Sequence, residues 1–194
     1  MFGRNGGAGL PELTPLFSGN AVDMEEKLRG FLNENFGDSI VREEMFRDQL
    51  SFVIQPDMLV DICQALMDSD ELDVKYLADI TAVDWLDHPS QEEGRFEVSY
   101  NLYSLSHQYR FFLKVRLPED KPNIATLCDL WRGANWMERE VFDLFGIVFD
   151  GHPELEKILT PDELEGHPLR KDFPLTYEVP QFSWNKDNPP EVVK

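Results

Sequence analysis

Hydrophobic residues recur at helical spacing in several stretches of the chain. Residues 22–36 carry apolar side chains at i, i+4, i+7 and i+8, the spacing of one helical face: Met24, Leu28, Phe31 and Leu32. Asn20 offers a capping oxygen before this stretch, and Gly37 can adopt the left-handed conformation that ends a helix. A second helix is expected to open at Pro56, because four apolar residues follow on one face: Leu59, Ile62, Cys63 and Leu66.

The second half of the chain contains two more helical patterns. Asn123 can cap a short helix whose apolar residues again fall at helical spacing: Ile124, Leu127, Cys128 and Trp131. Residues 136–145 are expected to form another helix with an apolar stripe made of Met137, Val141, Leu144 and Phe145. Gly146 follows this stripe and provides a C-cap.

Hydrophobic and polar residues alternate in other stretches, which predicts β-strands over residues 40–46, 50–54, 76–85, 96–102 and 109–117. The alternation is clearest in the last two stretches, and residues 105–108 between them suit a hairpin. An antiparallel sheet of this kind buries one face and leaves the other accessible. The pattern therefore predicts an α+β fold, with an antiparallel or mixed sheet of about four to five strands and helices packed on one face.

The texture changes after residue 149. Residues 151–194 contain seven prolines, which remove backbone donors and interrupt helices, together with aromatic residues that include Tyr177, Phe182 and Trp184. Such a segment can fold back over its own sheet or lie on another protein, and we favour an extended, proline-rich C-terminal arm that binds a partner. The expected organisation is a flexible N-terminus over residues 1–19, an α+β domain over 20–149 and the arm over 150–194.

Charge and composition exclude several classes of function. The 194 residues contain 37 acidic and 18 basic side chains, a formal charge of -19, which disfavours binding to nucleic acid or to anionic lipid. No apolar run approaches the ~20 residues that span a bilayer, and no secretory signal is recognisable. Two isolated cysteines, Cys63 and Cys128, form no Cys-x-x-Cys pair, so no four-thiolate cluster is expected and a reducing, cytoplasmic environment fits.

The densest polar group lies in the helix expected over residues 136–145. Glu138, Arg139, Glu140 and Asp143 are expected mostly on its surface, where Arg139 and Asp143 are spaced to form an ion pair. Glu140 and Asp143 could also bring two carboxylates to one site for acid–base chemistry. A solvated helix face, or a contact with a basic partner, is the simpler interpretation.

Two Gly-His-Pro triplets contain His152 and His167, which together with neighbouring acids could ligate a metal or could simply form turns. A basic stretch, Arg170 and Lys171 followed by Asp172, either neutralises local charge or anchors carboxylates of a partner. No nucleotide-binding glycine loop, phosphate loop or nucleophile elbow is present in the sequence.

The C-terminal blocks resemble one family. Residues 136–147 (WMEREVFDLFGI), 149–153 (FDGHP), 158–160 (ILT) and 165–174 (EGHPLRKDFP) are similar to the signature of the C subunit, or thirty-kilodalton subunit, of respiratory complex I. Glu156 departs from the basic residue or proline that this family usually has there. The family signature transfers to Glu138, Arg139, Glu140, Asp143 and His152.

The resemblance implies a peripheral-arm subunit of the proton-translocating NADH–quinone oxidoreductase, without catalytic residues, metal or cofactor of its own. FMN and iron–sulfur clusters would be held by other subunits, among them the B and I-type subunits, and NADH and quinone would be met only through the complex. The main partner would be the D subunit beside the quinone site, on the cytoplasmic side of the inner membrane. The expected partner-interface residues are Glu138, Arg139, Glu140, Asp143, Gly151, His152, Pro153, His167, Arg170, Lys171, Asp172, Tyr177, Phe182 and Trp184.

Three alternatives remain open on the sequence. The chain could be the homologous subunit of a ferredoxin-driven photosynthetic complex or of a membrane-bound hydrogenase. It could be a metal-dependent hydrolase that uses His152 and His167. It could also be an acidic adaptor without any redox partner.

Overall fold

The protein is represented by a computed structural model that describes residues 20–174. The flexible N-terminus expected over residues 1–19 and the aromatic residues Tyr177, Phe182 and Trp184 lie outside the described residues. No helix within the described range is both long and apolar enough to cross a membrane.

A five-stranded mixed sheet forms the centre of the fold, as the alternating pattern predicts. Its strands lie in the order β1-β2-β5-β4-β3, and only the β2–β5 pair is parallel. Their bounds are β1 (Ile40–Phe46), β2 (Gln49–Ile54), β3 (Tyr76–Asp84), β4 (Phe96–Ser104) and β5 (Tyr109–Leu117). Arg47 and Asp48, both with positive φ, close the two-residue hairpin between β1 and β2.

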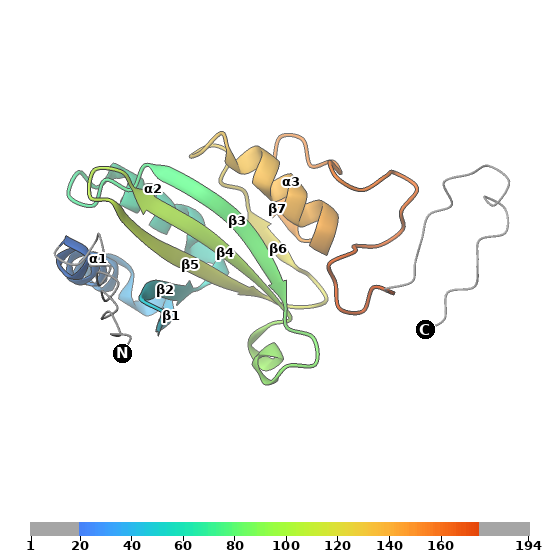
Figure 1. The fold of residues 1–194 in the computed structure, drawn as a ribbon, viewed down its shortest axis with the longest axis horizontal. Coiled ribbons are helices and arrows are strands. Elements are labelled where there is room, and N and C mark those ends of the chain that lie inside the picture. Colours follow the sequence, from blue (N-terminus) through green and yellow to red (C-terminus); the bar gives the residue numbers. More distant parts are fainter. Residues whose placement is uncertain (1–19, 175–194) are drawn as a thin grey trace, which may run out of the picture.

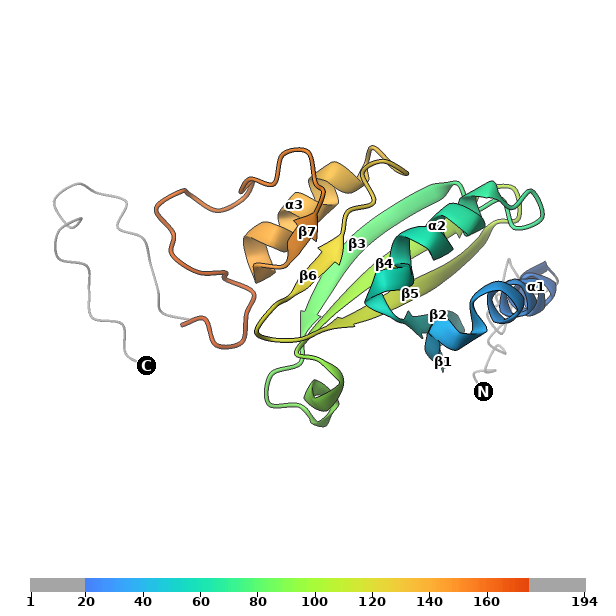
Figure 2. The ribbon, with the colours of Figure 1, turned by 180° about the vertical axis from the view of Figure 1, so that it is seen from behind.

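Helices cover one face of this sheet, as Figures 1 and 2 show from opposite sides. They are α1 (Asn20–Phe36), α2 (Leu59–Asp68) and α3 (Ala134–Phe145), and α3 packs beside the outer strand β3. The core between helices and sheet is apolar, and its largest fully buried side chains include Phe52, Phe96, Tyr100 and Phe111. The opposite face carries charged pairs such as Lys114 with Glu44, whose Nζ and Oε2 lie 2.7 Å apart.

The prediction of a short helix after Asn123 is wrong. Residues Asn123–Ala125 form strand β6, which pairs in parallel with β7 (Val148–Asp150), and turns follow it. Ile124, Leu127 and Trp131 are nevertheless buried, so a short strand and two turns satisfy the same apolar spacing that predicts a helix. The indole N–H of Trp131 donates to the carbonyl oxygen of Lys75 at 3.0 Å, which fixes this connection against the domain.

The segment after β7 has little regular structure and lies against its own chain (Figure 1). Leu169 donates its backbone N–H to the carbonyl oxygen of Leu144 in α3, and Lys171 donates its backbone N–H to the Asp84 carboxylate at the end of β3. Residues 151–174 thus fold back over their own domain, the simpler of the two possibilities left open for this segment. Residues 175–194 of the expected arm lie outside the described range.

Candidate functional site

Asp143 fixes the segment that follows β7 to the outer side of α3. One carboxylate oxygen accepts hydrogen bonds from three consecutive backbone N–H groups, those of Ile158 (3.0 Å), Leu159 (2.7 Å) and Thr160 (2.9 Å). The other oxygen accepts the Thr160 hydroxyl. Burial alone would raise the pKa of Asp143, but the hydrogen bonds from Thr160 and the backbone outweigh it and lower the pKa. We call residues 152–172, which lie along α3, the α3 clamp.

The end of the clamp satisfies the last carbonyl groups of α3, which have no partner within the helix. The Nδ1 atom of His167 lies 2.9 Å from the carbonyl oxygen of Asp143, so the imidazole donates this proton. Arg170 donates from Nε to the carbonyl oxygen of Phe145 at 2.5 Å. Gly146 ends the helix with φ 72°, and a Cβ there would collide with the His167 ring.

The start of the clamp runs along α3 in the same direction as the helix. His152 lies beside the carbonyl oxygen of Asn135, with Nε2 at 3.2 Å. One turn later Arg139 donates from Nε to the carbonyl oxygen of Glu156 at 3.1 Å. The side chain of Arg139 therefore holds the clamp and does not pair with Asp143, so the expected ion pair between these two residues is wrong.

A buried guanidinium ties the clamp to the sheet. Arg95 at the start of β4 binds both carboxylate oxygens of Asp84, at 3.0 and 2.9 Å, and also pairs with Asp172 at 2.8 Å and Glu119 at 2.9 Å. Burial alone would raise the pKa of Asp84, but Arg95 and the backbone N–H groups of Lys171 and Leu86 outweigh it and lower the pKa to about 2. We call Arg95, Asp84, Asp172 and Glu119 the Arg95 cluster.

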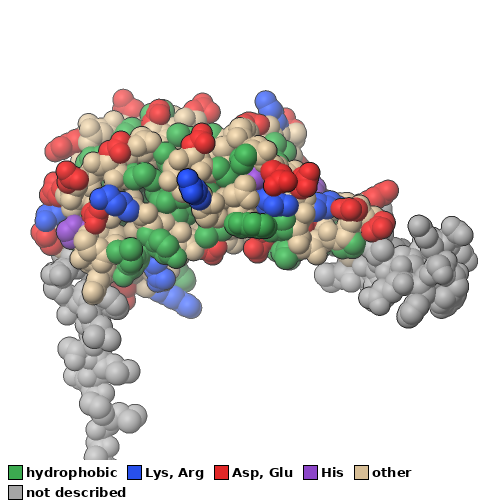
Figure 3. Space-filling view, turned by 90° about the horizontal axis from the view of Figure 1, so that it is seen from above, with side chains coloured by type: hydrophobic (Ala, Val, Ile, Leu, Met, Phe, Trp, Pro, Cys, Tyr) green, Lys and Arg blue, Asp and Glu red, His purple; other side chains and the backbone are tan. Residues whose placement is uncertain are grey.

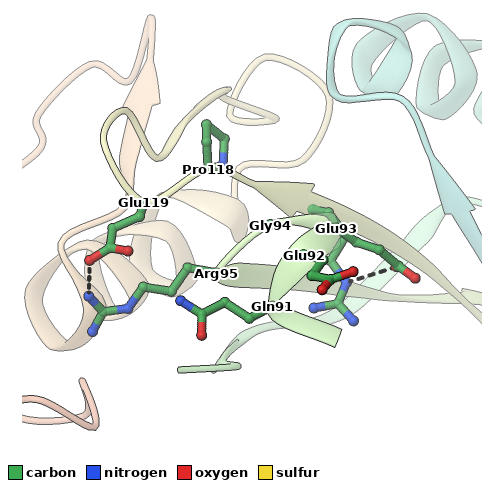
Figure 4. Close-up of a pocket in the computed structure, with 8 residues that line it drawn as sticks. Gln91, Glu92, Glu93, Gly94, Arg95, Pro118 and Glu119 are labelled. Atoms are coloured by element: carbon green, nitrogen blue, oxygen red, sulfur yellow. Dashed lines mark hydrogen bonds and ion pairs between the residues drawn. The ribbon is translucent and has the colours of Figure 1, made fainter. Parts of the chain in front are cut away.

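A cavity of about 330 Å³ borders this cluster. Figure 4 shows Arg95 reaching Glu119 on the segment after β5, with Gln91, Glu92 and Glu93 on the turn that leads into Arg95. The second guanidinium of the lining, Arg116, pairs with Glu97 at 3.0 Å. Because both cations of the lining are already neutralised by carboxylates of this chain, the cavity offers no free cation to an anionic substrate.

Glu138 is a fully buried carboxylate that organises the turn after β6. One of its oxygens accepts the backbone N–H of Leu127 at 2.7 Å, and the other accepts the hydroxyl of Thr126. Burial raises the pKa of Glu138 despite these hydrogen bonds, and it also raises the pKa of the neighbouring Cys128 thiol to about 11. Glu138 therefore holds a loop and is closed to solvent.

Cys128, Glu138 and His152 are the one group of three metal-binding side chains found within residues 20–174, with ligand atoms within 4.8 Å of one another. Both imidazole nitrogens of His152 already face backbone groups: Nε2 faces the carbonyl oxygen of Asn135, and Nδ1 accepts the N–H of Glu154. A neutral imidazole that uses both nitrogens in this way has no lone pair for a metal. This geometry supports a structural role for the group.

Of the two interpretations of the Gly-His-Pro triplets, turns are confirmed, and the alternative of one metal site shared by His152 and His167 is wrong. His152 lies beside Asn135 and His167 beside Asp143, which are helix positions roughly 12 Å apart along the axis. The clamp places the two Gly-His-Pro triplets at opposite ends of α3, where each imidazole binds a backbone carbonyl. Both triplets are turns, and Gly151 and Gly166 have positive φ.

The expectation that the charged residues of α3 lie on a solvated surface holds for Glu140 and is wrong for Glu138 and Asp143, which are 0% exposed. Glu138 lies in register with the apolar side chains of Val141 and Phe145, so it faces the core. Asp143 faces outward from the helix but is covered by the clamp. Glu140 and Asp143 therefore do not present two carboxylates to one site.

The remaining predicted residues lie in or beside the clamp. Arg170 and Lys171 bind backbone carbonyls of Phe145 and Leu86, and Asp172 pairs with Arg95. Gly151 and Pro153 are exposed in the turn that opens the clamp.

Sequence reasoning missed Asp84, Arg95 and Thr160. Asp84 follows Ile80 and Ala82 at every second position, so an acid occupies an inward-facing position of β3, which signals a buried partner. Arg95 directly precedes the strongest strand pattern. Nothing in the sequence around Thr160 indicates its contact with Asp143, because the two residues belong to different segments.

Known proteins share this fold and these motifs. Residues 52–179 match the family model described as the 30 Kd subunit of respiratory-chain NADH dehydrogenase, and the chain belongs to this family. The C subunit of NADH-quinone oxidoreductase from Roseiflexus sp. (strain RS-1) is 44% identical over 162 residues, covering 84% of this chain and 88% of that relative.

Two solved structures are similar to the described fold. A trypsin-resistant fragment of Nqo5 has a TM-score of 0.56 and 33% identity, covering 69% of this chain and 98% of the fragment. A chain of the membrane-bound sulfane sulfur reductase, an archaeal respiratory membrane complex, has a TM-score of 0.66 and 28% identity, covering 79% of this chain and 87% of that chain. The family, the α+β fold and the relation to the C subunit of NADH-quinone oxidoreductase are thereby established.

Proposed function

We propose that this protein is a non-catalytic, cofactor-free member of the peripheral arm of proton-translocating NADH–quinone oxidoreductase, complex I. Its role is to buttress the D subunit beside the quinone site and so to support electron transfer from NADH to quinone. The relatives, which are themselves named as the C subunit of this oxidoreductase, support the assignment. NADH and quinone are met only through the assembled complex.

The observation that carries the proposal is the use of the motif residues within the chain. Asp143, His167 and Arg170 hold the clamp in one conformation through backbone groups. Side chains that could perform acid–base chemistry thus hold the clamp against α3. A surface of fixed shape suits a protein whose contribution to the complex is binding.

Cofactors in this proposal belong to neighbouring subunits. FMN and iron–sulfur clusters lie in other peripheral-arm subunits, including the B and I-type iron–sulfur subunits. Both cysteines of this chain are free thiols: Cys63 is buried in α2, and Cys128 is half-buried beside Glu138. The protein lies on the cytoplasmic side of the inner membrane and is held there peripherally through the complex.

The partner-binding arm provides a direct test. Residues 175–194 are proposed to lie across the D subunit, with Tyr177, Phe182 and Trp184 as aromatic anchors. Deleting these twenty residues should reduce co-purification of the chain with the D subunit at least tenfold. Replacing only the three aromatic residues by alanine keeps the length of the arm and therefore tests the aromatic anchors alone. Undiminished assembly of the truncated chain would refute the anchoring role.

A second candidate is the homologous subunit of a membrane-bound hydrogenase or of a ferredoxin-driven photosynthetic complex. The likeness to a chain of the membrane-bound sulfane sulfur reductase favours keeping this candidate. Mass spectrometry of the purified parent assembly distinguishes the two functions, because NADH-binding flavoprotein subunits accompany only the respiratory form.

A further inference from the structure

Three large hydrophobic side chains on α3 and its clamp face solvent. Trp136 is 64% exposed, Leu159 is 60% exposed and Leu169 is 52% exposed. The backbones of the two leucines are fixed, because the N–H of Leu159 binds the Asp143 carboxylate and the N–H of Leu169 binds the carbonyl oxygen of Leu144. Hydrophobic groups on rigid backbone lose little conformational entropy when they are covered by a partner.

The side chain of Trp136 is also fixed by contacts within the chain. The guanidinium of Arg139 lies over the indole ring, 5.2 Å from its centroid, and Arg139 is itself bonded to the carbonyl oxygen of Glu156. The clamp covers the neighbouring outward position, Asp143, but leaves Trp136 open. Exposed, braced tryptophan is typical of the anchors that contribute most to protein interfaces.

Acidic side chains outnumber basic ones on the elements that carry these hydrophobic residues. The exposed acids of α3 and the clamp are Glu140, Glu154, Glu156, Asp162, Glu163, Glu165 and Asp172, of which Asp172 pairs with Arg95. Each Lys or Arg side chain of α3 and the clamp already donates to a backbone carbonyl oxygen of this chain: Arg139, Lys157, Arg170 and Lys171. Figure 3 looks onto the edge of the molecule where α3 lies and shows hydrophobic side chains with both acidic and basic side chains among them.

We infer that Trp136, Leu159 and Leu169 with these exposed acids, the α3 outer surface, dock a neighbouring protein subunit whose matching patch is apolar and rich in Lys and Arg. The inference rests on the proposed function and adds the contact surface and the chemistry of the partner. A second copy of this chain would bring two acidic surfaces together, and nucleic acid or anionic lipid would be repelled, so charge complementarity selects a basic protein surface.

Alanine substitutions test the hydrophobic part of the surface. Trp136→Ala, alone and with Leu159→Ala, should weaken binding of the full chain to the D-subunit-containing assembly at least tenfold in a pull-down titration. Phe46→Ala and Leu105→Ala are matched controls, because both side chains are equally exposed but lie at hairpin turns remote from α3, and they should bind as wild type. Unchanged thermal unfolding of each variant confirms that the fold is retained.

Charge reversal tests the chemistry of the partner. Glu154→Lys with Glu156→Lys should weaken binding at least fivefold at low salt and reduce its salt dependence. Glu26→Lys with Glu34→Lys makes the same change of charge on exposed positions of α1, at the other end of the molecule, and should leave binding unchanged. Stronger binding of the clamp reversal would overturn the basic character assigned to the partner.

The outcomes separate this inference from the proposed function. If wild-type chain fails to associate with the D subunit, the proposed function fails, and the inference fails with it. If wild type associates and both Trp136 variants associate equally well, only the inference is overturned. Self-association of the isolated chain that Trp136→Ala abolishes would assign the surface to a second copy and would also overturn it.

Discussion

Two carboxylates of α3 are completely buried, and their surroundings shift their pKa values in opposite directions. Asp143 collects four hydrogen bonds from the clamp, which lower its pKa, whereas burial dominates at Glu138 and raises its pKa. Asp143 therefore stabilises the fold in its ionised form, above the unfolded pKa of about 3.9, and this contribution is lost as the pH falls through the lowered value. The contribution of Glu138 is present below its unfolded pKa and is lost as the pH rises through the raised value.

Asp143→Asn should release the clamp. An amide nitrogen replaces one acceptor oxygen and faces donors, so we expect a loss of roughly 1–3 kcal/mol in the free energy of unfolding at pH 7. Amide hydrogen exchange at Ile158, Leu159 and Thr160 should accelerate. The exposed Glu140→Gln on the same helix should change stability by less than about 0.5 kcal/mol. Unchanged protection of the three amides would show that Asp143 does not hold the clamp.

At the scale of elements, the clamp completes α3 in a way that the helix cannot do alone. Its last turn leaves carbonyl groups without partners, and His167, Leu169 and Arg170 supply the donors from a segment more than twenty residues away. The close approach depends on Gly146, whose missing side chain leaves room for the His167 ring. The Gly146 cap and the end of the clamp therefore depend on each other.

Gly146→Ala should separate the clamp from the helix end. The left-handed conformation costs an L-residue roughly 1–2 kcal/mol, and the added methyl group collides with His167. Urea unfolding should therefore show a loss of at least about 1 kcal/mol. Gly30→Ala is the opposite control: it lies in α1, where an added Cβ would meet nothing within 4 Å, so it should stabilise by roughly 0.5–1 kcal/mol. Equal effects of the two changes would contradict the assigned role of Gly146.

At the scale of the whole molecule, the Arg95 cluster joins parts that are distant in sequence. It links the end of β3, the start of β4, the loop after β5 and the clamp through Asp84, Glu119 and Asp172. Since Asp84 and Asp172 both have lowered pKa values, the clamp and the sheet should separate together as acid protonates these carboxylates. The path of the chain at the end of the clamp depends on this cluster.

Asp84→Asn should remove much of the acid dependence of stability. The pKa of about 2 in the folded protein, against about 3.9 unfolded, corresponds to roughly 2–3 kcal/mol at pH 7. This contribution is present above about pH 4 and disappears toward pH 2, so the variant should differ most from wild type at neutral pH. Denaturant unfolding between pH 7 and pH 2.5 measures the difference. Asp79 is exposed on the same strand, so the stability of Asp79→Asn should depend on pH in the same way as that of wild type. The same pH dependence in Asp84→Asn as in wild type would contradict the stabilising role of the Asp84 carboxylate.

Local sequence determined the helices and strands where one face of each element meets the core. The alternation over residues 96–102 and 109–117 predicts β4 and β5 because period two is the geometry of a half-buried strand. The position of Glu138 among Ala134, Val141 and Phe145 could also be read from helical periodicity, which places it toward the core. The motif of residues 136–174 was sufficient to indicate the family.

Only the tertiary structure decided what the motif residues do. Asp143 faces away from the core of its own helix, and its burial comes from a segment that sequence periodicity cannot place. The same holds for the Arg95 cluster, whose members are drawn from four separate stretches. Periodicity indicates which side of a helix or strand is apolar, because the positions that share this side are set by the geometry of the element itself. The role of a charged residue depends instead on the groups that it contacts. Those groups come together only when the whole chain has folded.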